Sequence, residues 1–381
     1  MIVKAKKCKD AGMVKLILLG LLAGALFSST FILNEFMSSA GGHWFWSASL
    51  RYLFMWLLLT VIITMQHGFG RIKELTAIFC AHWRFWCITG SIGFGLFYTG
   101  ICYAGDHVAG WVVAATFMFT VVTSLLVLIA FGQRFDKKFI FYALLVFIGV
   151  LLVNVSEGLT ASEVASTPML EMLLYGALPA LVAAFCYPIG NQLVWQVSYN
   201  TRMQNAERRK WQENNSDHND NARSVTQSYA SSNSANSDPL LVAETAAQST
   251  LQKLINRIPA IETELLQNAF NKVWLMTLGS LPFWLILGII VHPEAPSSSQ
   301  VFNTLLVALL AGVGATSIFL YARERAETSS EVAGVDSTQA SEVIFALIGG
   351  ILLLNNALPS AMGLIGIGLI MLGLVLFAKD G

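Results

Sequence analysis

The chain has 381 residues, of which 55% are hydrophobic and only 12% are charged. A soluble globular protein carries about twice that share of charged residues, so the composition excludes an ordinary soluble enzyme and a disordered chain alike. The 23 basic residues equal the 23 acidic ones, which gives no basic surface for nucleic acid, and the 5 cysteines form no CxxC pair. We therefore predict an integral membrane protein with no metal site, no cofactor and no nucleic-acid partner.

Ten stretches are long and apolar enough to cross a membrane as helices, which takes about 20 residues each. In chain order they are residues 14–36, 44–65, 85–104, 108–131, 138–156, 170–199, 269–291, 301–322, 332–354 and 358–378. Strands of a membrane barrel are about half as long and alternate in polarity, which these stretches do not. We therefore predict an all-α bundle with ten transmembrane helices.

The positive charges predict how the bundle is oriented. If the N-terminus is inside, every Lys and Arg except Arg51 falls at the start, at the end or in an inner segment, and the outer loops hold none. Inner loops of membrane proteins are enriched in Lys and Arg. We therefore predict a multi-pass protein of the cell membrane (plasma or inner membrane) with both termini in the cytoplasm.

Short motifs recur between the two halves of the chain. Val108-Ala109-Gly110 in the fourth span returns as Val332-Ala333-Gly334 in the ninth, and the same spacing brings Gly149 of the fifth span onto Gly373 of the tenth. A repeat of five helices crosses the membrane an odd number of times, so its second copy points the opposite way. Inverted repeats of this kind are typical of secondary transporters, whose substrate site lies between the halves.

The domain organisation follows from the repeat. We predict one five-helix repeat in residues 1–156 and a second in residues 170–199 and 269–381. The cytoplasmic insertion 200–268 between them is rich in Asn and Ser, and we interpret it as disordered to about residue 238.

An amphipathic helix is expected in the rest of the insertion. Its apolar side chains recur at helical spacing and are Leu251, Leu254, Ile255 and Ile258. Such a helix lies on the membrane or the bundle, or binds a partner.

Three sequence segments resemble the drug/metabolite transporter superfamily, and within it the multidrug resistance efflux transporters. They are FSSTFILNEFMSSAGGHWFWSASLRYLFM, GFGLFYTGICYA and VDSTQASEVIFALIGGILLL. The resemblance implies a ten-helix fold with a central cavity and the export of small organic compounds. It also implies that the helices around the cavity bring aromatic side chains there, namely Tyr98, Tyr103, Trp111, Phe117, Tyr187 and Tyr321.

Two features depart from the superfamily pattern. Small four-helix exporters of the superfamily couple protons through a glutamate in the middle of the first helix. The first span here has no acidic residue between Leu16 and Leu33. The insertion 200–268 is also longer than the usual central linker.

The ninth span carries polar residues that a lipid-facing helix does not need. At 100° per residue, Asp336, Gln339 and Glu342 fall within one 120° sector. Their counterparts in the first repeat are apolar: Val112, Ala115 and Met118. Glu342 is near the middle of the span, and we expect it on the cavity as a cation-binding or proton-exchanging carboxyl. Asp336 is one turn from the cytoplasmic edge and is equally well explained as a hydrated residue at the interface.

Five more polar residues lie in the spans. For Arg51 and Glu35, which both lie toward the outer face, we expect a structural ion pair, with a role in transport as the alternative. Asn34, Asn191 and Gln192 either line the pathway or form hydrogen bonds between helices.

We expect a secondary active transporter and not an enzyme. The chain has no Walker A motif for ATP and no HExxH or GxSxG motif for hydrolysis. The expected partners are a small-molecule substrate, protons as the coupling ion and the lipid bilayer. The function predicted first is proton-coupled efflux of hydrophobic or cationic molecules. The alternative is the export or exchange of a polar metabolite such as an amino acid or a nucleotide derivative.

Overall fold

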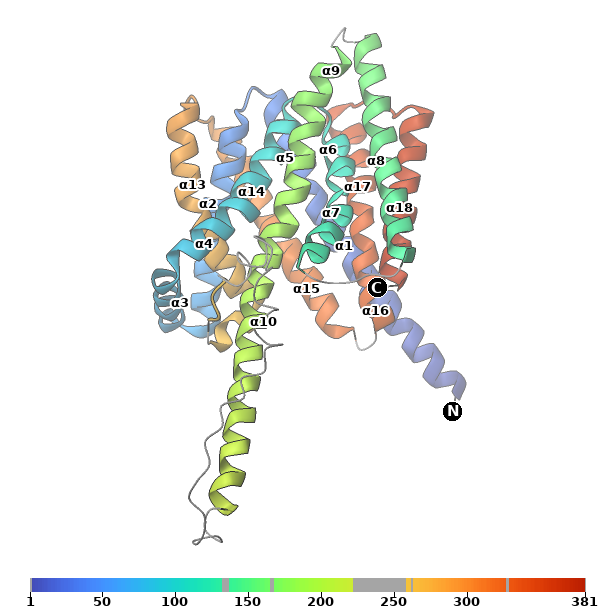
Figure 1. Ribbon diagram of the computed structural model, residues 1–381. Coiled ribbons are helices and arrows are strands. Elements are labelled where there is room, and N and C mark those ends of the chain that lie inside the picture. The colour runs from blue at the N-terminus through green and yellow to red at the C-terminus, as the bar shows by residue number, and fades with distance from the viewer. Residues whose placement is uncertain are drawn as a thin grey trace, which may run out of the picture.

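The computed structural model describes residues 2–131, 137–164, 168–221, 258–261, 263–326 and 329–380. Every regular element in these residues is a helix, and ten helical segments are long and apolar enough to cross a membrane (Figure 1). The prediction of an all-α membrane protein with ten spans is confirmed, and the predicted span ends lie within a few residues of the observed ones.

The first five spans contain two that are built from several helical pieces. The elements are α1 (Ile2–Ser39), α2 (Trp44–His67), α4 (Trp83–Gly90) with the π-helical turn η1 (Ser91–Leu96) and α5 (Phe97–Gly105), α6 (Gly110–Phe117) with α7 (Thr120–Ala130), and α8 (Lys137–Val164). A short helix that we did not predict, α3 (Phe69–Ala81), joins the second and third spans. It is too short and too charged to appear as a span.

The last five spans contain three that are built from several pieces. The elements are α9 (Met169–Met172) with η2 (Leu173–Ala177) and α10 (Leu178–Asn221), α13 (Ala269–Val291), α14 (Ser298–Val307) with the π-helical turn η5 (Ala308–Ala315) and α15 (Thr316–Arg325), α16 (Ser329–Ser337) with the 3₁₀ turn η6 (Thr338–Ala340) and α17 (Ser341–Leu354), and α18 (Ala361–Asp380). A 3₁₀ turn, η4 (Glu264–Gln267), precedes α13.

The structure differs from the prediction at the start of the insertion. Helix α10 continues to Asn221 and projects from the bundle at the end where both termini lie (Figure 1). Residues 202–213 are rich in Arg, Glu, Gln, Met and Ala, which favour a helix, and the Asn-rich and Ser-rich composition farther on hid this signal. The structure thus has a helix over 200–221, where the composition predicts disorder. Residues 222–257, which hold most of the predicted amphipathic helix, lie outside the described residues.

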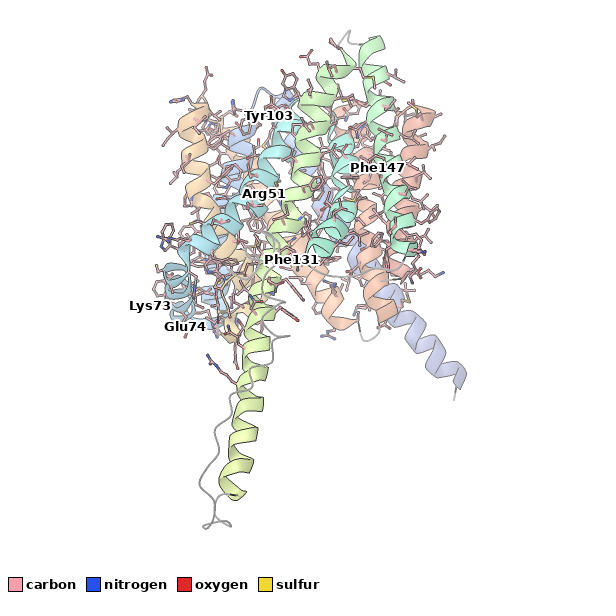
Figure 2. All side chains as sticks on the ribbon, in the orientation of Figure 1. Arg51, Lys73, Glu74, Tyr103, Phe131 and Phe147 are labelled. Atoms are coloured by element: carbon pink, nitrogen blue, oxygen red, sulfur yellow. The ribbon has the colours of Figure 1, made fainter. Side chains whose placement is uncertain are left out.

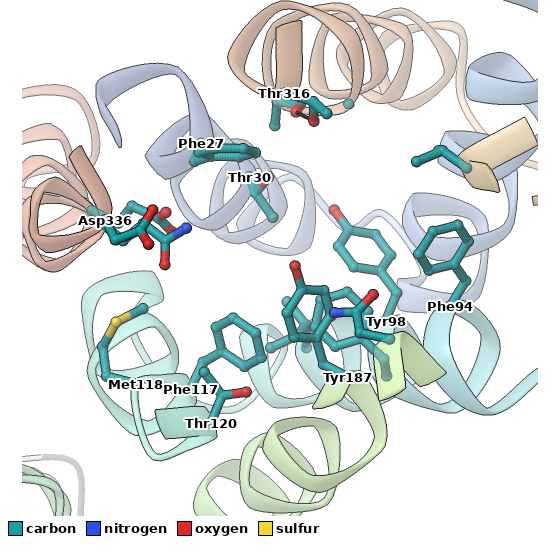
Figure 3. A pocket seen from close by; sticks show the side chains of 18 of the residues that line it. Phe27, Thr30, Phe94, Tyr98, Phe117, Met118, Thr120, Tyr187, Thr316 and Asp336 are labelled. Atoms are coloured by element: carbon teal, nitrogen blue, oxygen red, sulfur yellow. Dashed lines mark hydrogen bonds between the residues drawn. The ribbon is translucent and has the colours of Figure 1, made fainter. Parts of the chain in front are cut away.

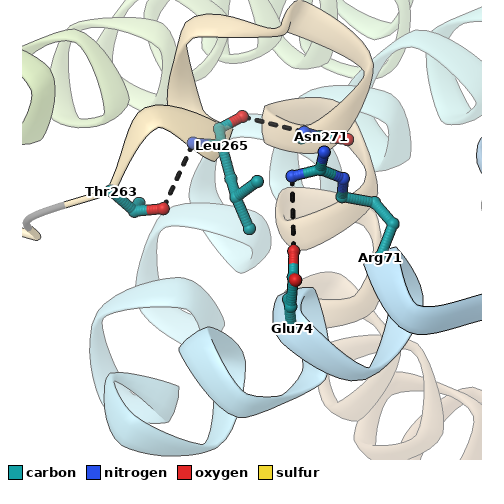
Figure 4. A network of polar contacts seen from close by, with 5 residues as sticks. All are labelled: Arg71, Glu74, Thr263, Leu265 and Asn271. Atoms are coloured by element: carbon teal, nitrogen blue, oxygen red, sulfur yellow. Dashed lines mark hydrogen bonds and ion pairs between the residues drawn. The ribbon is translucent and has the colours of Figure 1, made fainter. Parts of the chain in front are cut away.

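The chain enters the seventh span through a capped turn next to α3 (Figure 4). Thr263 Oγ1 accepts a hydrogen bond from the Leu265 N–H at 3.1 Å, and Asn271 Nδ2 donates to the Leu265 carbonyl at 2.8 Å. On α3, Arg71 and Glu74 form an ion pair at 3.3 Å. The caps fix the first turn of α13, and that turn lines the central cavity.

Helices of the two halves pack in matching pairs. The first span contacts the eighth and ninth, and the sixth span contacts the third and fourth. The second span packs on the seventh, and the fifth packs on the tenth. The third and eighth spans each contain a π-helical turn at a Gly-x-Gly sequence, in η1 and η5. The contacts made by each span of the first half are thus matched by those of the span five places later in the chain. The inverted orientation of the two repeats stays a prediction.

Glycines allow the closest of these contacts. Gly149 of α8 lies against the Gly366 carbonyl of α18, and a Cβ atom on either glycine would meet the other helix. Gly93 of η1 and Gly190 of α10 meet in the same way. Small residues at helix crossings are the usual means of close packing in membranes.

Candidate functional site

A cavity of about 970 Å³ lies between the two halves of the bundle. Its wall includes residues from the first four spans and from the sixth to the tenth. This volume is within the range of small-molecule sites in proteins. Figure 3 shows that side chains from several helices converge on it.

In the described part of the chain, the residues that line the cavity reach one end of the bundle and not the other. Its wall includes Ala269 and Lys272 at the start of α13, Arg323 near the end of α15 and Ala378 near the end of α18. The two chain ends lie at this end of the bundle (Figure 1). None of the lining residues belongs to the described loops at the other end. The charge pattern predicts that the open end is the cytoplasmic one.

Aromatic rings form much of the wall. The rings of Phe97 and Tyr187 are 5.1 Å apart, and those of Phe117 and Tyr187 are 5.7 Å apart. Deeper in the cavity, Tyr52 stacks on Phe94 at 5.0 Å and meets Tyr98 edge to face at 5.6 Å. Such faces attract cations by about 0.5–2 kcal/mol each.

The aromatic prediction is met in part. Tyr98, Phe117 and Tyr187 line the cavity (Figure 3), whereas Tyr103, Trp111 and Tyr321 are not among its lining residues. Tyr52 and Phe94 were missed because an aromatic residue in an apolar span has no sequence signal that separates the cavity from lipid.

The break in the ninth span places Glu342 on the cavity wall. Thr338 Oγ1 donates to the Val335 carbonyl at 2.6 Å, and Ser341 Oγ donates to the Thr338 carbonyl at 2.6 Å. Hydroxyl groups that bond back to the helix in this way bend it. Glu342 then stands in the first turn of α17, and its carboxyl has no hydrogen-bond or ion-pair partner among the described residues.

The other two residues of the predicted sector line the cavity as well. Gln339 is exposed on the wall, and Asp336 forms an ion pair with Arg323 at 3.2 Å. The side chains of Asp336 and Arg323 are 34% and 52% exposed. Asp336 is thus a half-hydrated, paired residue near the opening, whereas Glu342 is deeper and unpaired.

Arg51 lies at the closed end of the cavity and is not paired with Glu35. Its Nη1 donates to Thr30 Oγ1 at 3.3 Å, and its guanidinium carbon lies 4.1 Å from the centre of the Tyr98 ring. Figure 2 shows Arg51 inside the bundle, between Tyr103 near one end and Lys73 and Glu74 near the other. The predicted ion pair is wrong because Glu35 has other partners.

Glu35 joins three segments at the closed end. Its Oε2 accepts from the Gly110 N–H at 2.7 Å, and its Oε1 accepts from Asn356 Nδ2 at 2.7 Å. Gly110 is the first residue of α6, where N–H groups lack helical partners and favour an anion. Glu35 therefore ties α1 to the start of α6 and to the loop after α17, and it does not line the cavity.

The three amides separate into two groups. Asn191 is exposed on the cavity wall, which Tyr187 also lines. Asn34 is buried and donates from Nδ2 to the Tyr98 hydroxyl at 3.2 Å, so it holds two helices together. Gln192 is also buried, is not among the lining residues, and leaves its Nε2 without a partner.

Ten membrane-spanning helices around a cavity open at one end are the architecture of a multi-pass membrane transporter. A family model described as "Putative multidrug resistance efflux transporter" matches residues 14–380. The chain therefore belongs to this family of transporters, as the sequence segments predicted, and it is not an enzyme.

Two bacterial proteins are similar to most of the chain. The chain is 29% identical over 379 residues to the uncharacterized protein YjlA of Bacillus subtilis (strain 168), covering 95% of this chain and 94% of that protein. It is 27% identical over 325 residues to an uncharacterized 42.1 kDa protein of Shouchella clausii, covering 82% and 65% of the two chains. A solved crystal structure resembles it in fold, with a TM-score of 0.51, 12% identity and 96% of each chain covered.

Proposed function

We propose that this transporter is a secondary active exporter that moves hydrophobic or cationic small molecules out of the cytoplasm in exchange for protons. The observation that carries the proposal is Glu342, an unpaired carboxyl on the wall of a large aromatic cavity. An acidic side chain inside a membrane span is costly unless it has a partner or faces a cavity, and Glu342 has the cavity without a partner among the described residues.

The exchange of a proton for a cationic substrate follows if both bind the same carboxyl group. When Glu342 is ionised it attracts a cationic substrate, and the rings of Phe117 and Tyr187 add attraction from their faces. When a proton binds Glu342, that attraction is lost. Proton and cation therefore compete for one site, and the export of one is coupled to the entry of the other.

The helix pairing supports a transport cycle. The two halves have matching helix contacts, so they can rock against each other around a fixed site. The π-helical turns η1 and η5 lie at matching places in the third and eighth spans and give both halves the same weak point. The cavity open at one end is then one of the two states of the cycle.

Transport in proteoliposomes tests the proposal. The purified chain is reconstituted, and proton release is measured when a lipophilic cation such as ethidium is added. We expect Glu342→Gln to abolish cation-driven proton movement, because the amide keeps the shape but cannot ionise, and Glu342→Asp to retain part of it.

The matched control is Glu264→Gln, which changes an exposed carboxyl outside the spans. We expect it to transport as the wild type does. If Glu342→Gln moves protons as fast as the wild type between pH 6 and 8, proton coupling through Glu342 is refuted.

A further inference from the structure

Arg51 is a buried positive charge without an acidic partner. The residue is 9% exposed, its Nε has no hydrogen-bond partner, and it contacts neutral groups, namely the Thr30 hydroxyl and the rings of Tyr52 and Tyr98. A guanidinium group stays charged in a protein, and an uncompensated buried charge costs several kcal/mol. The ring face of Tyr98 offsets only part of that cost.

The acidic residues of the first and ninth spans do not neutralise it. Glu35 bonds to Gly110 and Asn356, and Asp336 pairs with Arg323. Glu342 lines the same cavity and forms no ion pair with Arg51. No described carboxylate therefore compensates Arg51, although the side chain lines a cavity large enough for a ligand.

The two unpaired charges lie at different depths. Counting 1.5 Å per residue, Arg51 is about 10 Å and Glu342 about 18 Å from the closed-end termini of α2 and α17. The ring of Tyr98 lies 4.1 Å from the guanidinium carbon of Arg51, and contacts between rings continue from Tyr98 to Phe97 at 5.8 Å and from Phe97 to Tyr187 at 5.1 Å. An aromatic surface thus extends from the positive group along the wall of the cavity that also holds the negative group.

We propose that Arg51 binds an acidic group of the transported compound while Glu342 faces its basic group. The substrates bound most tightly are then zwitterions, which add a carboxylate to the cationic group at the opposite end of a flat apolar body. A guanidinium group binds a carboxylate through two parallel hydrogen bonds, which makes it selective for that group. This inference rests on the proposed function, because it assumes that the cavity is the transport path, and it narrows the substrate class.

Matched pairs of ligands test the role of Arg51 without a proton gradient. The purified full chain in detergent is titrated with norfloxacin and with 4-(aminomethyl)benzoic acid, and then with the methyl ester of each. The ester keeps the amine and the ring but caps the carboxylate. We expect each acid to bind the wild type at least tenfold more tightly than its ester.

Substitutions then assign that preference. Arg51→Gln should bind acid and ester equally, and Arg51→Lys should keep a reduced preference, because a lysine offers charge without the two-pronged geometry. The control Arg71→Gln, which alters an ion pair outside the cavity, should keep the full preference. A thermal unfolding scan without ligand should show Arg51→Gln to be at least as stable as the wild type.

Equal binding of acid and ester by the wild type overturns the inference and needs no variant. A preference that survives in Arg51→Gln overturns it as well. Because binding is measured at equilibrium, loss of the acid preference leaves proton coupling through Glu342 standing. Conversely, a Glu342→Gln protein that still transports refutes the coupling and leaves the acid site at Arg51 standing.

Discussion

At the scale of single residues, the charged side chains in the bundle differ in whether the protein supplies their partner. Glu35 has two hydrogen-bond donors and Asp336 has Arg323. Glu342 has no polar partner in the described part of the chain, and Arg51 has only a hydroxyl and two ring faces. The paired groups are satisfied without a ligand, so the unpaired groups are the candidates for binding one.

A substitution of Asp336 tests whether paired and unpaired charged groups differ in their importance for transport. An ion pair as exposed as Asp336–Arg323 contributes about 0–1 kcal/mol, so we expect Asp336→Asn to keep more than about half of the wild-type transport rate. The same assay on Glu342→Gln should show almost none. Proton release from proteoliposomes measures both, with equal protein insertion checked by detergent extraction. If Asp336→Asn is as inactive as Glu342→Gln, the lack of an ion-pair partner does not distinguish the role of Glu342 in transport from that of Asp336.

At the scale of helices and loops, the closed end of the cavity is held by contacts that a transport cycle must break. Glu35 bridges the end of α1, the first turn of α6 and the loop after α17 through two bonds of 2.7 Å each. The bridged segments are far apart in the chain, and they close the end at which Arg51 and Ile101 form the floor of the cavity.

We expect Glu35→Gln and Asn356→Ala to loosen the closed end, because each removes or weakens a hydrogen bond to a charged group. The measurement is the rate at which a membrane-impermeant thiol reagent, added at the closed end, labels Ile101→Cys in a cysteine-free protein. Both variants should raise that rate several-fold. Glu171→Gln changes an exposed carboxyl at the same end and should not, and unchanged rates in all three variants would show that Glu35 is not a latch.

Helix packing allows a second test at this scale, with a control on the same helix. A Cβ atom on Gly366 would meet the Gly149 carbonyl of α8, whereas a Cβ atom on Gly368 would meet nothing within 4 Å. We expect Gly366→Ala to destabilise the bundle by about 1–3 kcal/mol through overpacking. Gly368→Ala should be neutral or slightly stabilising, because alanine favours the helix. Thermal unfolding in detergent compares the two, and equal melting temperatures would contradict close packing of α8 on α18.

At the scale of the whole molecule, the sequence predicts properties that add up along a segment, such as hydropathy. It does not predict which helices contact one another in the bundle. Each span is recoverable because hydropathy adds up over about 20 residues. The polar sector that contains Glu342 can be predicted, because the matching positions of the first repeat are apolar. The hydrogen-bond partners of Glu35 cannot be predicted in this way. Helical spacing shows which residues share a face of one helix, but not which other helix that face contacts.

Because contacts between helices cannot be predicted from spacing, the predicted Arg51–Glu35 ion pair is wrong and the lining residues Tyr52 and Phe94 are not predicted. Glu35 and Asn356 are 321 residues apart, and no local pattern links them. Tyr52 and Phe94 read as ordinary lipid-facing or packed rings until the bundle is assembled around them. Depth along neighbouring helices alone favours pairing Arg51 with Glu35, whereas in the structure Glu35 bonds to Gly110 and Asn356 and Arg51 has no acidic partner among the described residues.

The direction of transport depends on which end of the bundle faces the cytoplasm. The open end of the cavity carries Lys272, Arg323 and the exit of α10, and positively charged segments stay inside during insertion. We therefore expect single cysteines at Glu264 and Lys379 to be labelled by an impermeant thiol reagent only in everted vesicles. Cysteines at Gly41 and Ser297, in loops at the closed end, should be labelled in intact cells. With this result the described state takes up its substrate from the cytoplasm, as an exporter must. Labelling of Glu264→Cys in intact cells would reverse the bundle and make the same cavity an uptake site.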